Sequence, residues 1–599
     1  MCGYLGVVSK NLFDSEILLK PNNKIICRGP DETICLNSKD ISDNNLTNFS
    51  FIFNRLSILD LTNKGSQPMV SEETKSILMF NGEIFNHKEL RADLADRGIN
   101  FKSTNSDSEV LLYGLEVYGT EFVNKIIGQF AIAFYNLREN CIYLIRDRLG
   151  QKPLFYQLKN NSLTFGSNLL SVAEVSNSHN MDEYSMREFL SLGVVRSPRT
   201  IISEVFKLLP AEILKIDLND FSQSSSIYWR PDQNINEDKF SKKDFLSIFS
   251  DSISKRLESD VPVANFLSGG IDSTSIIKNL NEQGQKINTF SAVYSDSKYD
   301  ESEWIEKVKK RYSTNHSEAQ LDIDLDIEKI FEVIDIFDEP YCDPSVVPSF
   351  FLNKLISKSY KVALSGDGGD ELLGGYKRVS EVLASSNIIK SLYSKIYYLY
   401  PSFLGTGNHF KLRSPDIKER YESYFVDKKF LSLLKVNEKI NFKENNFKNS
   451  NSDYKSLLLT DYSYFLPEMM MLKIDRTSMA NSLEVRSPFV DHRLIEYVMK
   501  HDTNYFERKN TKKVLKEYLM EDFNDTFINR KKMGFVFNLE KFIYNNKSEI
   551  FKYITDNNSL INSVDKKLKK LNRVKSRMNA IRIFKLLILT RYHNNLLKL

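Results

Sequence analysis

The stretch Val261-Pro-Val-Ala-Asn-Phe-Leu267, followed at once by Ser268-Gly269-Gly270-Ile271-Asp272-Ser273, decides the fold of the second half of the chain. An apolar run, two glycines and a helical pattern to Leu280 predict a strand, a tight turn and a helix. Glycines let the backbone approach a ligand closely, and the N–H groups at a helix N-terminus favour an anion. The stretch therefore predicts a pyrophosphate-binding loop. The alternative is an ordinary strand–helix turn, since the loop lacks both a Walker ending and a GxGxxG pattern.

The same rhythm continues downstream. Strand patterns recur at Lys286–Tyr294 and Tyr360–Leu364, separated by helical stretches, which is typical of a parallel α/β sheet. From about residue 380 to 599 the chain reads as helical, with an Asn/Lys-rich interruption at 438–453 that we expect to be a mobile surface loop. After Asp565 the pattern predicts a solvated amphipathic helix; a membrane surface or an acidic partner is the alternative.

A second cluster follows the strand that ends at Leu364. Ser365-Gly366-Asp367-Gly368-Gly369-Asp370-Glu371 places three carboxylates within five residues. Carboxylates at that density need a counter-cation, and Mg²⁺ bound together with a triphosphate fits. A solvated acidic turn is the alternative. Downstream, the segments around Lys473, Arg476 and Arg486 group cations that could meet a leaving pyrophosphate.

The first half has a different organisation. Residues 1 to about 205 alternate short strands rich in Ile, Val, Phe and Tyr with helical patterns at His87–Arg97 and Ser106–Tyr118, which fits a layered α+β sandwich. Phe221 to Phe240 is polar and predicts a linker.

Composition excludes several classes of protein. The 599 residues carry 82 Lys and Arg against 78 Asp and Glu, and this net charge of +4 is too balanced for a nucleic-acid partner. The length predicts two to four domains. No apolar run is long enough for a membrane span, the N-terminus has no signal-peptide pattern, and five scattered cysteines suit neither disulfides nor a metal site. We expect a cytoplasmic protein.

Ordered together, the motifs of both halves resemble the glutamine-hydrolysing asparagine synthetases, which are class II glutamine amidotransferases. The resemblance covers nearly the whole chain. It is carried in the first half by Met1-Cys2-Gly3, Arg28-Gly29-Pro30-Asp31, Arg55-Leu56-Ser57-Ile58, Phe80-Asn81-Gly82-Glu83-Ile84, Ser106-Asp107-Ser108-Glu109 and Arg146 to Leu154. In the second half it is carried by Phe266 to Ser273, Asp338-Glu339-Pro340, Ser365 to Glu371, Asn481 to Arg486 and Arg530 to Phe535.

The resemblance implies two domains. Residues 2–215 would form an N-terminal nucleophile (Ntn) hydrolase, an αββα sandwich with glutaminase activity, and residues 216–240 a linker. Residues 241–599 would form an α/β ATP-pyrophosphatase domain, similar to the adenine nucleotide α-hydrolases, with a helical C-terminal part.

In the glutaminase domain the resemblance implies that Cys2 is the nucleophile, freed by removal of Met1, with its own α-amine as the base. Asn81 and Gly82 would donate to the oxyanion. Arg55 would hold the glutamine carboxylate, and Asp107 with Glu83 the ammonium group.

In the second domain the resemblance implies that ATP adenylates aspartate and that ammonia from an internal channel displaces AMP. The nucleotide-binding residues would be Leu267, Ser268, Gly269, Gly270, Asp272, Ser273, Ala292, Ser365 and Gly366. Asp272, Asp370 and Glu371 would hold Mg²⁺. Asp367, where the family often carries Glu, would act on the acyl-adenylate. Arg476 would face the phosphates, with Lys473 as a neighbouring candidate.

Two questions stay open from the sequence. One is the acceptor, because relatives with this acidic loop also amidate other carboxylates such as uronic acids of surface polysaccharides. The other is the oligomeric state, for which a homodimer is one option. A non-catalytic, glutamine-sensing relative is a third alternative, and the intact Cys2, Asn81 and Asp272 argue against it.

Overall fold

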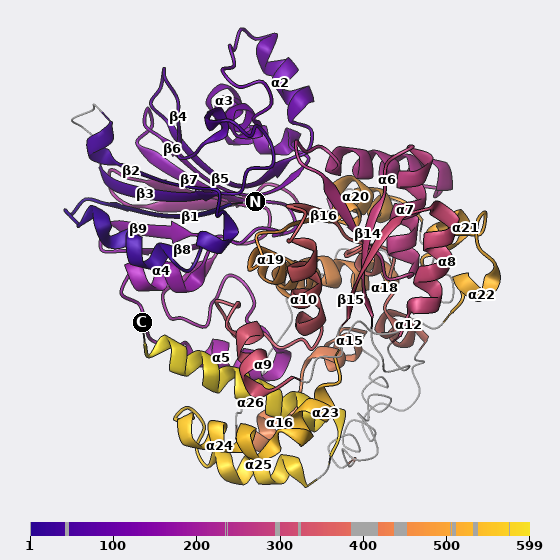
Figure 1. Cartoon of the computed structure of the whole chain (residues 1–599). Coiled ribbons are helices and arrows are strands. Elements are labelled where there is room, and N and C mark those ends of the chain that lie inside the picture. Colours follow the sequence, from indigo (N-terminus) through magenta and orange to yellow (C-terminus); the bar gives the residue numbers. More distant parts are fainter. Residues whose placement is uncertain are drawn as a thin grey trace.

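Figure 1 shows the computed structural model of the chain, with a β-rich part packed against a helix-rich part. The structure describes residues 2–41, 47–233, 235, 238–293, 300–320, 325–384, 400, 417–435, 452–502, 505, 511–530, 537–573 and 575–598. Nearly all of the predicted 438–453 loop therefore lies outside the described residues.

Two antiparallel six-stranded sheets form the first domain. One has the order β10-β8-β9-β1-β3-β2 and the other β12-β11-β7-β6-β5-β4. The strands are β1 (Gly3–Ser9), β2 (Glu32–Asn37), β3 (Asn48–Arg55), β4 (Met69–Val70), β5 (Ile77–Ile84), β6 (Gly128–Asn136), β7 (Cys141–Arg146), β8 (Phe155–Lys159), β9 (Ser162–Gly166), β10 (Phe206–Lys207), β11 (Glu212–Asp217) and β12 (Gln223–Ile227).

Alternation along β1 explains the layering. Tyr4 and Val8 point between the sheets, whereas Leu5 and Val7 point outward to a second core. The helices α4 (Leu169–Val175) and α5 (Glu183–Leu192) belong to that second core, and α2 (His87–Ala95) and α3 (Asp107–Tyr118) cover the other sheet. The expected αββα sandwich is confirmed.

The expected linker contains a strand of this domain. β12 pairs antiparallel with β11 throughout its length, so residues 223–227 belong to the sandwich and the boundary at residue 215 falls inside β11. All five residues of β12 are exposed. An edge strand without a buried face has no hydrophobic alternation, so its polar sequence resembled a linker.

The second domain contains a five-stranded sheet in the order β15-β14-β13-β16-β17, and every neighbouring pair is parallel. This confirms the predicted parallel α/β sheet. Its strands are β13 (Val263–Phe266), β14 (Asn288–Val293), β15 (Asn315–Gln320), β16 (Val362–Leu364) and β17 (Glu484–Arg486). One face carries α6 (Lys242–Arg256), α7 (Ile271–Glu282), α20 (His492–Lys500) and α21 (Lys513–Leu519); the other carries α10 (Val346–Ile356) and α19 (Leu472–Met479).

The C-terminal part is helical, as expected, but its helix α26 (Arg577–Leu596) is not a solvated amphipathic helix. Its apolar residues from Ile583 to Leu589 lie in the core shared with α5, α23 (Leu539–Asn545) and α24 (Lys547–Asn557). α25 (Val564–Asn572) buries only one side, through residues such as Leu568.

Two cations of α26, Arg582 and Lys585, suggested a solvated helix although they are buried and have partners. Arg582 forms two hydrogen bonds with Asp427, at 2.7 and 2.8 Å. Lys585 Nζ donates to the carbonyls of Leu190 and Ser191 in α5, at 3.0 and 2.7 Å. These partners lie more than 150 residues away in sequence, so the charges appeared free. No helix within the described residues is both long and apolar enough to cross a membrane.

Candidate active sites

Cys2 lies at the start of β1, beside a small cavity of about 30 Å³. That volume holds about one water molecule. The wall brings together most of the predicted glutaminase residues. It consists of Cys2, Arg55, Leu56, Ile58, Leu59, Gly65, Gln67, Phe80, Gly82, Glu83, Ser106, Asp107 and Ser108.

Asn81 is held against the nucleophile. Cys2 N donates to Asn81 Oδ1 at 3.1 Å, which turns the amide so that Oδ1 is used as an acceptor. Asn81 Nδ2 is buried and has no hydrogen-bond partner within the described residues. A buried donor without a partner is costly unless a ligand supplies an acceptor. The arrangement therefore fits an oxyanion donor.

Gly82 follows on the same strand and can only be glycine. A Cβ at this position would lie 2.1 Å from the carbonyl oxygen of Gln129 on β6. The absence of a side chain leaves this part of the Cys2 cavity wall as main chain.

Burial raises the pKa of the Cys2 thiol, although Arg55 opposes this shift. A thiol with a raised pKa is mostly protonated at neutral pH and is a weak nucleophile. The site therefore needs a base close to the sulfur.

Three charged groups complete the wall. Arg55 donates through Nη1 to the carbonyl of Thr62 at 2.7 Å and through Nη2 to that of Asp60, so its guanidinium is fixed by main chain. Asp107 accepts from Ile84 N at 3.0 Å. Burial raises the pKa of both Asp107 and Glu83. Two buried carboxylates of this kind suit a cationic ligand group.

The second domain contributes to the same site, which the sequence did not reveal. Arg486 Nη2 of β17 lies 3.3 Å from Glu83 Oε2, and Arg486 Nε lies 2.5 Å from Glu484 Oε1. The cation predicted at the phosphates, Arg486, thus contacts Glu83 in the wall of the Cys2 cavity.

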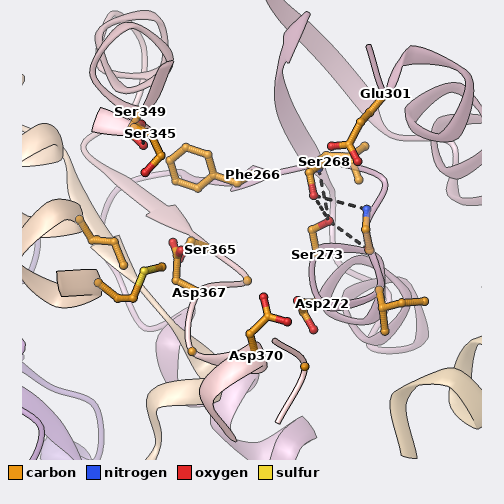
Figure 2. Close-up of a pocket in the computed structure, with 18 of the residues that line it drawn as sticks. Phe266, Ser268, Asp272, Ser273, Glu301, Ser345, Ser349, Ser365, Asp367 and Asp370 are labelled. Atoms are coloured by element: carbon orange, nitrogen blue, oxygen red, sulfur yellow. Dashed lines mark hydrogen bonds between the residues drawn. The ribbon is translucent and has the colours of Figure 1, made fainter. Parts of the chain in front are cut away.

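A second cavity, of about 610 Å³, opens at the carboxyl ends of β13, β14 and β16, where parallel α/β sheets bind ligands. Figure 2 shows serines and carboxylates from several elements pointing into it. Among the predicted residues it is lined by Leu267, Ser268, Gly270, Asp272, Ser273, Ala292, Ser365, Gly366, Asp367, Asp370 and Glu371. Ala292 lies in β14 and Ser365 directly follows β16, the two strands that flank β13.

The glycine loop is organised by its two serines. Ser268 Oγ and Ser273 Oγ lie 3.1 Å apart, and Gly270 N donates to Ser268 Oγ at 3.3 Å (Figure 2). Gly269 adopts a φ of +65° and packs against Trp304, so it shapes the turn and does not line the cavity. The loop places two hydroxyls and the N-terminus of α7 at one spot, which suits an anion.

Asp272 and Asp370 converge on one cation. Lys512 Nζ lies 2.6 Å from Asp272 Oδ2 and 2.5 Å from Asp370 Oδ1, and Figure 2 shows the two carboxylates facing each other. Gly369 permits this approach, because a Cβ there would lie 2.7 Å from Asp272 Oδ1.

The donor set partly fits the expected magnesium ion. Two carboxylates that meet at one point, in a cavity large enough for a triphosphate, suit Mg²⁺. Glu371 is directed elsewhere, since its Oε1 accepts from Tyr376 at 2.6 Å, and burial together with Asp370 raises its pKa to about 7. In the part of the chain that the structure describes, no group of three or more His, Cys, Asp or Glu is placed to hold a metal ion.

Arg476 does not line the cavity. Its guanidinium bonds Asp338 at 2.7 and 2.9 Å and Asp475 at 2.6 Å, all buried. Asp475 is also held by Arg28 of the first domain, with two contacts at 2.8 Å. Arg476 therefore belongs to an ion network between the domains, whereas Lys473, one turn earlier, lines the cavity.

Other groups of the cavity were missed. Lys512, Lys516, Arg530, Glu301 and Ser345 all line it. Lys512 and Asp272 are 240 residues apart, and no spacing in a single sequence shows such a pair. The segment 531–536, which follows Arg530 in the resemblance, lies outside the described residues.

Comparison with known proteins agrees with this geometry. A family model described as asparagine synthase matches residues 244–560, just over half of the chain, and one described as glutamine amidotransferase domain matches residues 1–229. The chain belongs to the asparagine synthase family. The asparagine synthase match includes the loops around Ser268 and Ser365, and the glutamine amidotransferase match includes the Cys2 cavity and β12.

Proteins similar to this chain in sequence are named as asparagine synthetases. Asparagine synthetase [glutamine-hydrolyzing] 1 of Bacillus subtilis is 29% identical over 92% of this chain and 89% of its own length. Asparagine synthetase [glutamine-hydrolyzing] 2 of the same organism is 30% identical over 90% of this chain and 72% of its own length. A putative asparagine synthetase of Methanocaldococcus jannaschii is 33% identical over 63% of this chain and 76% of its own length.

Proposed function

We propose that this member of the asparagine synthase family is a glutamine-dependent asparagine synthetase, which converts aspartate, ATP and glutamine to asparagine, AMP, pyrophosphate and glutamate. The observation that carries the proposal is that one chain holds two cavities, one beside Cys2 and one between the Ser268 and Ser365 loops.

In the first cavity Cys2 is the nucleophile. Removal of Met1 converts Cys2 N into an α-amine, whose ordinary pKa near 7.7–8.0 lets it take the thiol proton. The thiolate attacks the side-chain amide of glutamine, and Asn81 Nδ2 and Gly82 N–H donate to the oxyanion. The tetrahedral intermediate expels ammonia and leaves a thioester, which water hydrolyses to glutamate. Asp107 and Glu83 bind the substrate ammonium group, and Arg55 binds its carboxylate.

In the second cavity a carboxylate oxygen of the acceptor attacks the α-phosphorus of ATP, which gives an acyl-adenylate and releases pyrophosphate. Ammonia then attacks the acyl carbon and AMP leaves. The loop Ser268–Ser273 holds the pyrophosphate, and Lys473 and Lys512 stabilise the negative charge. Asp367 acts in the formation and use of the acyl-adenylate. Asp272 and Asp370 would hold Mg²⁺, which would neutralise phosphate charge when bound with ATP.

An apolar cluster supports transfer of ammonia between the cavities. Leu56 and Ile58, which line the Cys2 cavity, pack with Val362 of β16 and Met479 of α19 in one buried cluster. A dry, apolar passage favours neutral ammonia over ammonium, and neutral ammonia is the nucleophile that the acyl-adenylate needs.

Two measurements test the proposal. Cys2→Ala should lose glutaminase activity and keep ammonia-dependent synthesis; glutamine hydrolysis at the wild-type rate would refute the mechanism. Pyrophosphate release from ATP should rise with aspartate, and a panel of uronic acids is the control. If aspartate does not stimulate release, the acceptor is another carboxylate.

A further inference from the structure

The strand β17 lies between the two cavities. Its three residues alternate in direction, as strand geometry requires. Val485 lines the larger cavity, whereas Arg486 and Glu484 on the opposite face reach the Cys2 site. One three-residue strand therefore separates the two sites and contacts both.

Arg486 is fixed on the side of the second domain. Its Nη1 donates to the carbonyls of Arg256 and Glu258 at 2.9 and 2.6 Å, and its Nε pairs with Glu484. The side chain is fully buried, so these contacts operate without competing water. Only Nη2 is directed to the first domain, where it meets Glu83 at 3.3 Å.

The contact with Glu83 is the weak one of the set. Neither Arg486 Nη2 nor Glu83 Oε1 makes a hydrogen bond to any described residue, although the two groups form an ion pair. Buried polar atoms without hydrogen bonds point to a missing ligand. The ammonium group of glutamine, which the proposed function assigns to Glu83 and Asp107, supplies the donors that Glu83 lacks.

The main chain of Arg486 reaches the other cavity. Ser365 N donates to the carbonyl of Arg486 at 2.9 Å, and Ser365 Oγ lies 2.9 Å from Ser487 Oγ. Ser365 begins the loop that continues through Asp367 and Asp370 in the wall of the ATP cavity. A main-chain hydrogen bond therefore joins Arg486 to the start of this loop.

We propose that Arg486 is a positioning residue that couples glutamine binding at Glu83 to nucleotide binding at the Ser365 loop. This inference rests on the proposed function. When the substrate ammonium group binds Glu83, the Arg486 guanidinium pairs with Glu484 alone. β17 and the Ser365 loop then adopt the arrangement that binds nucleotide. Coupling between two sites is reciprocal, so ATP must also tighten the binding of glutamine.

The test measures binding without turnover, in the full-length Cys2→Ala protein. The dissociation constant for glutamine is determined by calorimetry with and without ATP and Mg²⁺. We expect ATP to lower it about fivefold or more, which is the usual range of such coupling. Arg486→Lys keeps the charge but loses the planar guanidinium. The ratio of the glutamine dissociation constants without and with ATP should therefore fall to about two in Arg486→Lys, and to about one in Arg486→Gln.

A matched control is Arg476→Lys, which changes another buried, ion-paired arginine at the domain interface that lines neither cavity. It should keep the wild-type ratio. Ammonia-dependent synthesis should persist in both Arg486 variants, because the coupling operates only when glutamine is bound. If Arg486→Gln does not fold, the ratio measured in Arg486→Lys tests the inference.

Three results would overturn the inference. The first is a glutamine dissociation constant that ATP does not change in the Cys2→Ala protein. The second is a ratio of dissociation constants without and with ATP that stays at the wild-type value in Arg486→Lys. The third is an equal loss of ammonia-dependent and glutamine-dependent synthesis in the Arg486 variants made with Cys2 intact. Each leaves the proposed function standing if the wild type hydrolyses glutamine and makes asparagine. Absence of glutaminase activity in the wild type would instead overturn the proposed function, and this inference with it.

Discussion

The side-chain amide of Asn81 offers the sharpest test of the glutaminase site. Asn81→Ala removes Nδ2, the buried donor that has no partner among the described residues, and also removes the acceptor for Cys2 N at 3.1 Å. Loss of one oxyanion donor costs about 10²–10³ in kcat, or roughly 2.7–4 kcal/mol of transition-state stabilisation. The main-chain N–H of Gly82 survives, so we expect reduced rather than abolished hydrolysis.

The assay is the rate of glutamate formation from glutamine at saturation. Cys2 N–H loses its acceptor, which costs about 1–3 kcal/mol of stability, so a thermal melt must show that the variant is folded at the assay temperature. Ammonia-dependent synthesis in the same protein reports on the second domain and should stay at the wild-type rate.

Gln129→Ala is the matched control. Gln129 lies on the neighbouring strand β6, is equally buried, and its Nε2 also has no partner within the described residues, but Cys2 N donates to Asn81 and not to Gln129. It should therefore lose less than about threefold in kcat, the scale of an indirect effect. If Asn81→Ala matches this control, Asn81 is not an oxyanion donor.

The remaining predictions concern the second domain. Lys512→Met removes the cation shared by Asp272 and Asp370 and should lower ammonia-dependent synthesis about 10²-fold with glutaminase unchanged; parallel losses of both activities would contradict it. Burial and Asp370 raise the pKa of Glu371 from 4.5 to about 7, so the folded protein binds a proton that the unfolded chain has released, and this carboxyl group lowers stability by up to about 3 kcal/mol as the pH rises through that window. Glu371→Gln should therefore show a smaller difference between melting temperatures at pH 5 and pH 8 than the wild type, and equal differences would count against it. Arg476→Gln breaks a buried ion network and should lower the free energy of unfolding by about 3–5 kcal/mol, measured with denaturant. The KM for ATP should stay within about threefold of the wild-type value, and a large rise in KM would indicate that Arg476 binds the phosphates.

Local patterns in the sequence predicted much of the architecture. β13 and α7 formed where an apolar run, two glycines and a helical pattern indicated them, because strand, turn and helix signals all come from neighbouring residues. Ser106 caps α3 as expected, with its Oγ accepting from Glu109 N at 3.4 Å. Those cavity residues that the sequence did predict came from motifs of this local kind.

The misses share one physical cause, which is pairing at long range. Arg476, Arg582 and Lys585 are charged in sequence but buried in the structure, because partners far along the chain neutralise or solvate them. Lys512 lines the larger cavity for the same reason. β12 is the opposite case, since an exposed edge strand carries no pattern at all.

The burial of α26 has a consequence for how the protein is made. α5 ends at residue 192, and α26, one of the helices that pack against it, is synthesised about 400 residues later. At roughly 5–20 residues per second, a ribosome needs about 20–80 s to cover that distance. During this interval the apolar surface around Phe189 and Leu190 lacks the cover that α26 supplies, so the nascent first domain is exposed to aggregation and to chaperones. Slowing translation after residue 200 should therefore lower the soluble yield, and co-expression of a chaperone that shields apolar surface should restore it.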